Sequence, residues 1–396
     1  MKALVLEENG KLVWREHELR RVDGWYRVRI AAAGICGSDL GRGFKGGAYH
    51  YPLVMGHEFS AVVEEAPAGG KYAPGTLAAV YPLLPCGKCA ACAKGWIQLC
   101  EHYDYFGSRR DGAFAEELYV PESHILPVPD GVTAEEAAMA EPAAVAYHGT
   151  HGFDMEKGAK ALVIGGGPIG LIAAQWLRIR GAGEVTVADI DAAKLEFAAK
   201  LGFKTLDTGG PRSVAAAAGT RDAYPYQYDV VVEACGVSAT RDMAVACCAR
   251  KGVVSFIGNP ADDWTFAKPL FSSVLRKELT MRGNWNSVPD PDWCEVLEER
   301  REELLRALLD GWIGRGEVLV GVRAMPGREE DAVVGGAFPQ VDELLPVVAV
   351  DWRAGNFKEV ESELGDLLDV LEVVSLPFVF PVGVVDSVFH RLVVSG

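Results

Sequence analysis

The sequence lacks the features that would place it in several large classes of protein. It has no run of basic side chains, and its formal net charge of −16 with a pI near 5.0 opposes binding to a phosphate backbone. The segment MKALVLEENGKLVW has neither the basic region nor the apolar stretch of a signal peptide. No later stretch reaches about 18 uninterrupted apolar residues. We therefore expect a cytoplasmic protein with no nucleic-acid partner and no membrane span.

Cysteine is scarce outside one short segment. Four of the nine cysteines form the pattern Cys86-x-x-Cys89-x-x-Cys92, followed by seven residues and Cys100. Four thiolates this close together suit a tetrahedral structural zinc with no open position. An iron–sulfur cluster is the rival interpretation, but the last gap fits neither common ferredoxin spacing. The interleaved Gly and Lys residues argue against four unligated cysteines in a core strand.

Length and composition indicate a globular protein of two domains. The 396 residues exceed one ordinary domain, and the hydrophobic share of 49% and charged share of 24% are typical of globular chains. No internal repeat and no low-complexity linker is present. The function must therefore come from specific sites.

The pattern of apolar residues changes at about residue 150. Before it, short β-type runs such as YRVRIAAAG (26–34) and EFSAVVEEA (58–66) predict an irregular β-rich domain over 1–150. After it, apolar strands alternate with helical stretches, which predicts an α/β domain with a doubly wound parallel sheet over 151–287. The runs DVVVEACG (229–236) and GVVSFIGNP (252–260) end in the glycine turns expected beside a ligand crevice.

A glycine-rich motif follows the first strand of the second domain. Gly165, Gly167 and Gly170 form G-x-G-x-x-G, with Pro168 and Ile169 opening a predicted helix. The first glycine permits a tight turn, the second lets the backbone approach a pyrophosphate, and the third allows close helix–strand packing. A merely glycine-rich turn would be the simpler interpretation if the motif stood alone.

An acidic residue supports the nucleotide interpretation. Asp189 ends the next predicted strand, 19 residues after Gly170, where a carboxylate accepts hydrogen bonds from the adenosine ribose. A carboxylate there repels a 2′-phosphate, so we expect NAD rather than NADP. Asp191 and Lys194 lie nearby, either at the rim of this site or as solvated charges at a helix start.

A second metal signal is dispersed along the first domain. Cys36 lies in GICGSD, His57 and Glu58 in GHEFS, and Glu141 in AEPAAV. One thiolate, one imidazole and one carboxylate leave a fourth zinc position for a substrate oxygen. Taken singly, each residue also has a structural explanation, as a core cysteine, a hydrogen-bonded histidine or a helix-start carboxylate.

These segments together resemble a known family. GICGSD, GHEFS, the four-cysteine segment, AEPAAV and GGGPIG occur in the order and spacing of the zinc-dependent medium-chain alcohol dehydrogenases, over about residues 1–290. Within that family the chain is most similar to galactitol-1-phosphate dehydrogenases and then to sorbitol (iditol) dehydrogenases. The resemblance implies a GroES-like catalytic domain, a Rossmann domain and NAD. It also implies two zinc ions per chain, one catalytic and one structural.

The resemblance also implies roles for the dispersed residues. Cys36, His57 and a carboxylate would hold the catalytic zinc, with Glu58 and Glu141 both candidates for that carboxylate. Ser38 occupies the position that contacts the substrate hydroxyl in the family. The relay histidine of many members is replaced by Gly41, which leaves the proton route beyond Ser38 open.

The substrate implied is a small polyol or polyol phosphate, handled by a homodimer or homotetramer. Lys45, Arg109 and Arg110 are candidates for binding a phosphate, since guanidinium groups bind phosphate bidentately, although each could equally be a solvated surface charge. Rival functions are a zinc-binding redox sensor without turnover, a zinc-free quinone reductase, or a dehydrogenase of threonine or butanediol.

The resemblance fails after about residue 311. Residues 288–396 are expected to rejoin the catalytic domain, but the tail is acidic, nearly free of lysine, and ends in FVFPVGVVDSVFHRLVVSG. A divergent extension, a frame change in the gene and a recombined segment all account for it, and we favour a frame change. The first domain would then lack its closing elements, although every candidate site residue precedes the break.

Overall fold

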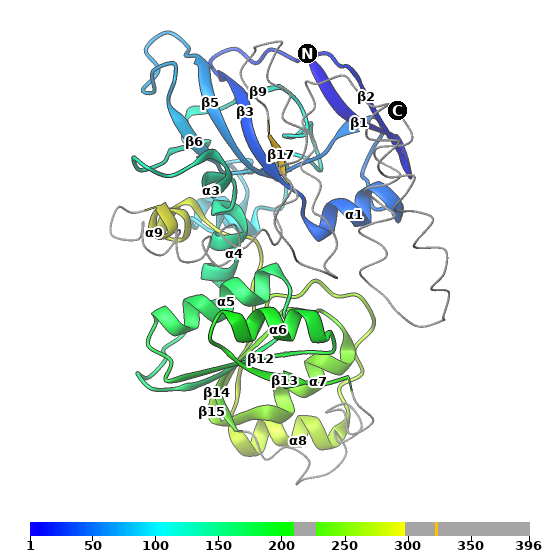
Figure 1. Cartoon of the computed structure of the whole chain (residues 1–396), viewed down its shortest axis with the longest axis vertical. Helices are drawn as coiled ribbons and strands as arrows, with labels where there is room; N and C mark the ends of the chain where they lie inside the picture. Colours follow the sequence, from blue (N-terminus) through cyan, green and yellow to red (C-terminus); the bar gives the residue numbers. More distant parts are fainter. Residues whose placement is uncertain (210–226, 298–320, 324–396) are drawn as a thin grey trace, which may run out of the picture. The chain divides into compact units, whose positions relative to one another are not determined.

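A computed structural model describes residues 1–209, 227–297 and 321–323 (Figure 1). The described chain divides into two compact units, each considered by itself below. The first unit contains Met1–Trp96, Cys100–Glu141 and residues 321–323, and the second contains Ile97–Leu99 and the described chain from residue 142 to residue 297. The division falls within helix α4 (Ala140–Thr150). The predicted domain limits at residues 150 and 287 remain predictions.

The first unit is built from short, mostly antiparallel strands. Its largest sheet has the order β10-β6-β5-β3-β17, with β9 also paired to β3. A smaller sheet has the order β2-β1-β4, and β7 pairs with β8. The strands are β1 (Lys2–Glu8), β2 (Lys11–Glu16), β3 (Tyr26–Gly34), β4 (Leu53–Val54), β5 (Glu58–Glu65), β6 (Leu77–Val80), β7 (Leu83–Leu84), β8 (Asp104–Tyr105), β9 (Glu117–Val120), β10 (Ile125–Pro127) and β17 (Gly321–Arg323).

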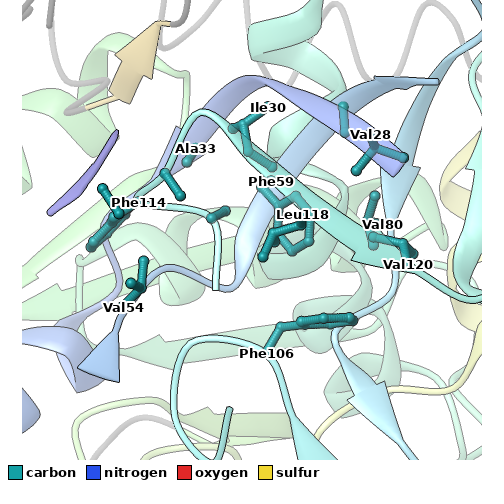
Figure 2. Close-up of a cluster of buried hydrophobic side chains, with 14 of the residues drawn as sticks. Val28, Ile30, Ala33, Val54, Phe59, Val80, Phe106, Phe114, Leu118 and Val120 are labelled. Carbon is teal, nitrogen blue, oxygen red and sulfur yellow. The ribbon is translucent and has the colours of Figure 1, made fainter. Parts of the chain in front are cut away.

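The core of the first unit lies between these strands. Alternate residues of β3, including Val28 and Ile30, point into it because successive side chains of a strand face opposite sides. Phe59 and Phe106 pack edge to face with ring centroids 6.1 Å apart (Figure 2). This core holds the C-terminal end of β3, two residues before Cys36, and the N-terminal end of β5 at Glu58. Candidate metal ligands lie at both ends.

The helices of the first unit are short. They are α1 (Gly37–Phe44), α2 (Ala90–Ala93) and α3 (Ala134–Ala138), with 3-10 turns η1 (Ile97–Leu99) and η2 (Glu122–His124), the first of which groups with the second unit. Thr133 and Glu136 form a reciprocal capping box that begins α3.

The second unit has a six-stranded parallel sheet with the order β13-β12-β11-β14-β15-β16. In chain order this is the 3-2-1-4-5-6 arrangement of a Rossmann fold, whose order reverses between β11 and β14. The strands are β11 (Lys160–Ile164), β12 (Glu184–Asp189), β13 (Lys204–Asp207), β14 (Tyr228–Glu233), β15 (Cys248–Phe256) and β16 (Thr280–Gly283). Together with the antiparallel first unit, this sheet confirms the predicted fold class.

Helices connect the parallel strands. Helix α5 packs against β11 and β12, and its apolar residues Leu171 and Ile172 are buried. The fully buried Trp176 packs edge to face against Tyr147 of α4, with ring centroids 5.1 Å apart. The helical elements of this unit are α4, α5 (Pro168–Ile179), α6 (Ala192–Lys200), α7 (Ser238–Cys247), α8 (Lys268–Lys277), η4 (Pro289–Trp293) and α9 (Cys294–Leu297).

One short piece of the C-terminal segment is described. Strand β17 pairs antiparallel with β3, with Gly321 opposite Gly34 and Arg323 opposite Ala32. The rest of the tail, for which a frame change is favoured from the sequence, lies outside the described residues. Among the described helices, none is long and apolar enough to cross a membrane.

Candidate active site and metal centres

The four clustered cysteines of the first unit come together in space. The sulfur atoms of Cys86, Cys89, Cys92 and Cys100 all lie within 4.8 Å of one another. Cys89 Sγ is 3.5 Å from Cys92 Sγ and 3.8 Å from Cys100 Sγ. Four sulfurs about 2.3 Å from one zinc would be about 3.8 Å apart at the corners of a tetrahedron. The spacing therefore fits a closed zinc site.

Backbone amides favour negative charge on this cluster. Cys89 caps α2, and the amide of Cys92 donates to its sulfur, which with the Glu101 amide lowers the pKa of Cys89 to about 6. By contrast, desolvation and a hydrogen bond to Cys89 raise the pKa of Cys92 to about 12. Because one thiolate opposes the ionisation of its neighbours, a cation is needed for all four to act as thiolates.

Three of the dispersed residues also converge. Ligand atoms of Cys36, His57 and Glu58 lie within 4.8 Å of one another. His57 and Glu58 are buried and Cys36 is half-buried. A thiol, an imidazole and a carboxylate form the mixed set that zinc accepts in catalytic sites, where a further position stays open. Among the described residues, no fourth ligand atom completes this group.

Helix α1 positions the first ligand. Cys36 is its N-cap, and the Ser38 amide donates to Cys36 Sγ at 3.5 Å. The Cys36 amide in turn donates to Asp39 Oδ2 at 3.0 Å, which completes a reciprocal cap. The Ser38 amide and the positive end of the helix dipole stabilise negative charge on Cys36 Sγ, but burial outweighs them and the pKa of the thiol is raised.

Asp39 faces the imidazole of the second ligand. Its Oδ1 lies 3.5 Å from His57 Nδ1, which has no better-aligned partner among the described residues. Burial lowers the pKa of His57, but Asp39 and Cys36 outweigh it and raise the pKa well above its usual value. With Nδ1 facing a carboxylate that is only 1% exposed, Nε2 is the nitrogen left for a metal. Asp39, three residues after Cys36, was not among the residues predicted from the sequence.

Burial makes negative charge costly throughout this cluster. It raises the pKa of the Cys36 thiol, with a further contribution from Glu58. Burial and the nearby carboxylate of Glu141 raise the pKa of Glu58 to about 8. Buried acidic groups that oppose one another's ionisation favour a cation that neutralises them. The donor set therefore fits zinc on electrostatic as well as geometric grounds.

The carboxylate of Glu58 lies against a glycine of the neighbouring strand. Gly34 ends β3 and pairs with Glu58 at the start of β5. A Cβ atom at Gly34 would lie 2.4 Å from Glu58 Oε2. Only glycine leaves room for the carboxylate at this position, so Gly34, the first glycine of GICGSD, is needed for Glu58 to lie where it does.

Glu141 lies beside the cluster but outside the group of three. It is buried near the start of α4, and Tyr105 Oη donates to its Oε1 at 3.3 Å. The Tyr105 ring packs edge to face with His57, with centroids 5.7 Å apart. The structure therefore brings Glu58, not Glu141, to the thiol and the imidazole, and leaves Glu141 as a buried neighbouring charge.

The glycine motif of the second unit forms the loop between β11 and α5. Gly165 has a φ of +107°, and a Cβ at Gly170 would lie 1.9 Å from the carbonyl oxygen of Gly165. A Cβ at Gly167 would meet no atom within 4 Å. Pro168 and Ile169 begin α5. The tight turn therefore lies at Gly165, the close packing at Gly170 and the open approach at Gly167, which are the positions expected from the sequence.

Asp189 lies at the end of β12 beside this loop. Its Oδ2 accepts a hydrogen bond from the Gly166 amide at 2.7 Å, and its Oδ1 accepts one from the Asp191 amide at 2.9 Å. Lys194 Nζ is 3.8 Å from Oδ2. Asp191 caps α6 by accepting from the Ala193 amide at 2.9 Å, so its carboxylate has a structural role.

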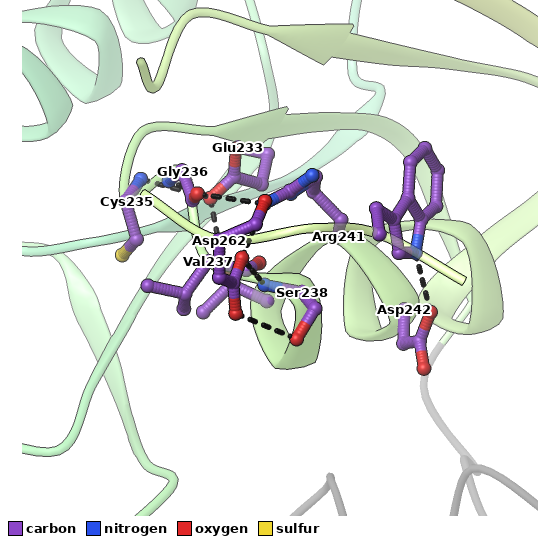
Figure 3. A network of polar contacts seen from close by, with 10 residues as sticks. Glu233, Cys235, Gly236, Val237, Ser238, Arg241, Asp242 and Asp262 are labelled. Carbon is purple, nitrogen blue, oxygen red and sulfur yellow. Dashed lines mark hydrogen bonds and ion pairs between the residues drawn. The ribbon is translucent and has the colours of Figure 1, made fainter. Parts of the chain in front are cut away.

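A second acidic residue, which the sequence analysis missed, holds the loop after β14. Glu233 is fully buried, and its Oε1 accepts from the amides of Cys235 and Gly236 and from Thr240 Oγ1, each at 2.8 Å. Arg241 donates to the Gly236 carbonyl at 2.9 Å and pairs with Asp262 (Figure 3). This network fixes the chain at the point where the strand order reverses.

The three cationic substrate candidates differ in their surroundings. Arg110 Nε lies 3.5 Å from Asp104 Oδ2. Arg109 has no carboxylate within ion-pair distance in the described part of the chain, and its guanidinium stacks on Tyr49 and Tyr103, 4.7 and 4.3 Å from their ring centroids. Lys45 is exposed at the C-cap of α1. Of the three, Arg109 combines two ring contacts with a charge that no carboxylate pairs with among the described residues.

Comparison with known families agrees with this geometry. Residues 22–130 match the family described as "Alcohol dehydrogenase GroES-like domain", and residues 168–301 match "Zinc-binding dehydrogenase". The chain belongs to the zinc-dependent medium-chain alcohol dehydrogenase family, a class of nicotinamide-dependent oxidoreductases.

Two relatives within that family are named for a polyol phosphate and for a sugar acid. The chain is 35% identical to galactitol 1-phosphate 5-dehydrogenase of Escherichia coli K12 over 319 residues, which covers 77% of this chain and 90% of the relative. It is 33% identical to L-galactonate-5-dehydrogenase of the same organism over 303 residues, covering 75% and 86%.

Solved structures of dehydrogenases also match the chain. The crystal structure of galactitol-1-phosphate dehydrogenase from Escherichia coli matches with a TM-score of 0.70 at 32% identity, covering 82% of this chain and 100% of that chain. A putative zinc-binding dehydrogenase from Sinorhizobium meliloti 1021, bound to NADP, matches at 0.68 and 29% identity, covering 75% and 87%. A dehydrogenase from Escherichia coli CFT073, complexed with NADH, matches at 0.66 and 27%, also covering 75% and 87%.

Proposed function

We propose that this enzyme oxidises a secondary hydroxyl of a polyol that carries an anionic group, using NAD and a zinc ion held by Cys36, His57 and Glu58. The observation that supports it most is the convergence of these three ligand atoms within 4.8 Å of one another in the first unit, with His57 and Glu58 buried. Glu141 is the neighbouring charge rather than the ligand, because Tyr105 already donates to it.

Zinc bound there would act as a Lewis acid that lowers the pKa of an alcohol and favours loss of its proton. The residues of this chain supply the rest. Asp39 orients the His57 imidazole, the N-terminus of α1 favours the Cys36 thiolate, and Ser38 stands two residues from Cys36 to contact the substrate hydroxyl. Cys86, Cys89, Cys92 and Cys100, which we call the four-cysteine lobe, form a closed set of thiols that would hold a second, structural zinc.

The choice of NAD over NADP rests on Asp189. The Gly166 and Asp191 amides hold its carboxylate at the end of β12, where it would accept from a ribose hydroxyl and repel a phosphate. Lys194 is a possible partner for a 2′-phosphate, but at 3.8 Å it already faces the Asp189 carboxylate, and this pairing favours NAD.

The anionic group is inferred from Arg109. Its contacts with the Tyr49 and Tyr103 rings orient the guanidinium, and with no carboxylate paired to it in the described part of the chain its N–H groups are available to a phosphate or carboxylate. Tyr103 packs on Tyr105 with centroids 6.1 Å apart, and Tyr105 packs on His57, so the cation belongs to the same cluster of rings as the metal ligands. The two relatives named above are named for anionic substrates and for position 5.

A screen of NAD reduction tests the proposal. Sorbitol, iditol, xylitol and galactitol should be compared with their monophosphates and with the corresponding sugar acids. We expect an anionic compound to give the highest kcat/KM. A preference for an uncharged alcohol, or for threonine or butanediol, would contradict the substrate class.

Two matched arginine variants sharpen the test. Arg109→Gln removes the unpaired cation, and we expect KM for the anionic substrate to rise about tenfold or more, as for loss of a charged hydrogen bond. The control is Arg110→Gln, since the Arg110 guanidinium already pairs with Asp104. Equal effects of the two variants would remove Arg109 from the substrate site.

The alternative of a redox sensor without turnover is separated by metal content. A sensor needs only the zinc of the four-cysteine lobe, whereas the enzyme needs a second ion at Cys36, His57 and Glu58. The homodimer or homotetramer and the cytoplasmic location remain predictions, for which chromatography with light scattering and cell fractionation are the tests.

A further inference from the structure

Helix α1 carries an arginine that contacts two members of the proposed active site. Arg42 Nη1 lies 3.0 Å from Ser38 Oγ and 3.0 Å from Asp39 Oδ1. The side chains meet because residues three and four positions apart share a face of a helix. Arg42 is only 15% exposed, and Asp39 is 1% exposed, so the contact is shielded from solvent.

The direction of the Arg42–Ser38 hydrogen bond is fixed by chemistry. A guanidinium has only donors and stays protonated, so Ser38 Oγ must be the acceptor. One lone pair of the serine oxygen is thereby occupied, and its own O–H proton is free to point elsewhere. Gly41 stands where many relatives carry a relay histidine, and Arg42, the next residue, cannot take up a proton.

We propose that Arg42 is a positioning residue that fixes the Ser38 hydroxyl as a hydrogen-bond donor to the substrate oxygen. This inference rests on the proposed function. A donor aimed at that oxygen stabilises the negative charge that develops as its proton leaves. The substrate's proton then passes to a solvent water rather than along α1, because the Arg42 guanidinium next to Ser38 cannot accept a proton.

The same guanidinium also pairs with Asp39. Asp39 Oδ2 accepts from the Cys36 amide, and Oδ1, which accepts from Arg42, also faces His57. Among the described residues, Arg42 makes no hydrogen bond to Cys36, His57 or Glu58, so removing the arginine should leave these three ligands in place. The position therefore separates an effect on the substrate oxygen from an effect on the metal.

A double-mutant cycle on Arg42 and Ser38 tests the proposal with the full chain and its best substrate. We expect Arg42→Gln to lower kcat about tenfold, as for one charge-assisted hydrogen bond, with KM nearly unchanged. Arg42→Lys should recover most of the loss. In the Ser38→Ala background, Arg42→Gln should change kcat by less than about twofold. Arg29→Gln, which breaks the 2.9 Å pair with Glu64, is the control for loss of an arginine ion pair.

Zinc content and melting temperature provide the readouts other than activity. Arg42→Gln should retain as much zinc as the unmodified chain. Its melting temperature should fall, because the buried Asp39 carboxylate loses its ion-pair partner, so kcat is expressed per folded molecule. An undiminished tenfold effect in the Ser38→Ala background, a rise in KM without a fall in kcat, or loss of one zinc would each overturn the assignment. Failure of the proposed function is distinguishable, since it would appear as absent turnover and absent zinc in the unmodified chain.

Discussion

The two candidate metal sites of the first unit differ in nearly every property that matters for chemistry. The four-cysteine lobe takes all its ligands from residues 86–100, offers only thiols, and has three of its four cysteines partly exposed. The other site combines Cys36 with His57 and Glu58, offers three different donor types, and has two buried members. A closed set of thiols suits a structural ion, whereas a buried mixed set suits an ion that binds substrate. The predictions below test this difference.

The largest effect is expected from Cys36→Ser. Losing the thiolate removes the Lewis acid, which lowers the barrier by several kcal/mol, so turnover should fall by about a thousandfold or more. One zinc should be lost, while NAD binding, followed by fluorescence titration, should be unchanged because Gly167 and Asp189 belong to the other unit. Near-normal turnover would remove Cys36 from the catalytic site.

Asp39→Asn should weaken the same site without removing a ligand. The carboxylate that faces His57 Nδ1 orients the imidazole and raises its basicity, and loss of such a partner costs roughly 10- to 100-fold in metal affinity. Chelator competition measures this affinity directly. The matched control is Asp104→Asn, which loses only the contact with Arg110 and should retain zinc. If Asp39→Asn bound zinc as tightly as that control, the assigned role of Asp39 would be wrong.

Cofactor preference should respond to Asp189 more than to its neighbour. Asp189→Gly, preferably with an added basic residue, is expected to shift the ratio of kcat/KM for NAD and NADP towards NADP by about tenfold or more, because the repulsion of a 2′-phosphate is lost. Asp191→Ser keeps a cap for α6 and removes a charge only two residues away. An unchanged ratio for Asp189→Gly, or an equal shift for both variants, would contradict the NAD assignment.

Cys92→Ala should have the smallest effect on catalysis and a clear effect on stability. A closed thiolate site contributes through folding free energy, so one zinc should be lost and the melting temperature should fall by roughly 10 °C. The rate per folded molecule should stay within about twofold of the unmodified chain. Loss of all turnover in molecules that remain folded would contradict the structural role of this lobe.

Much of the fold follows from local patterns in the sequence. The run YRVRIAAAG coincides with β3, and DVVVEACG and GVVSFIGNP contain most of β14 and β15. The β–turn–α unit around Gly165 was readable because glycine spacing, an apolar strand and an amphipathic helix agree with one another. The four-cysteine lobe was readable for a similar reason, since all its ligands lie within one short segment.

The residues around Cys36 were harder to predict. Helix α1 is GSDLGRGF, which contains three glycines and therefore has poor intrinsic helix propensity. Its helical form depends on the cap between Cys36 and Asp39 and on packing, so the face shared by Ser38, Asp39 and Arg42 was not visible in the sequence. The choice between Glu58 and Glu141 likewise depends on the pairing of β3 with β5, which is a tertiary contact.

The division into a catalytic and a structural zinc site is tested most directly by the zinc content of three chains, counted by native mass spectrometry alongside NAD-dependent turnover. We expect two zinc ions and activity for the unmodified chain, one ion and no activity for Cys36→Ser, and one ion with activity per folded molecule retained for Cys92→Ala. A single zinc in the unmodified chain, or two ions in either variant, would contradict the division into a catalytic and a structural site.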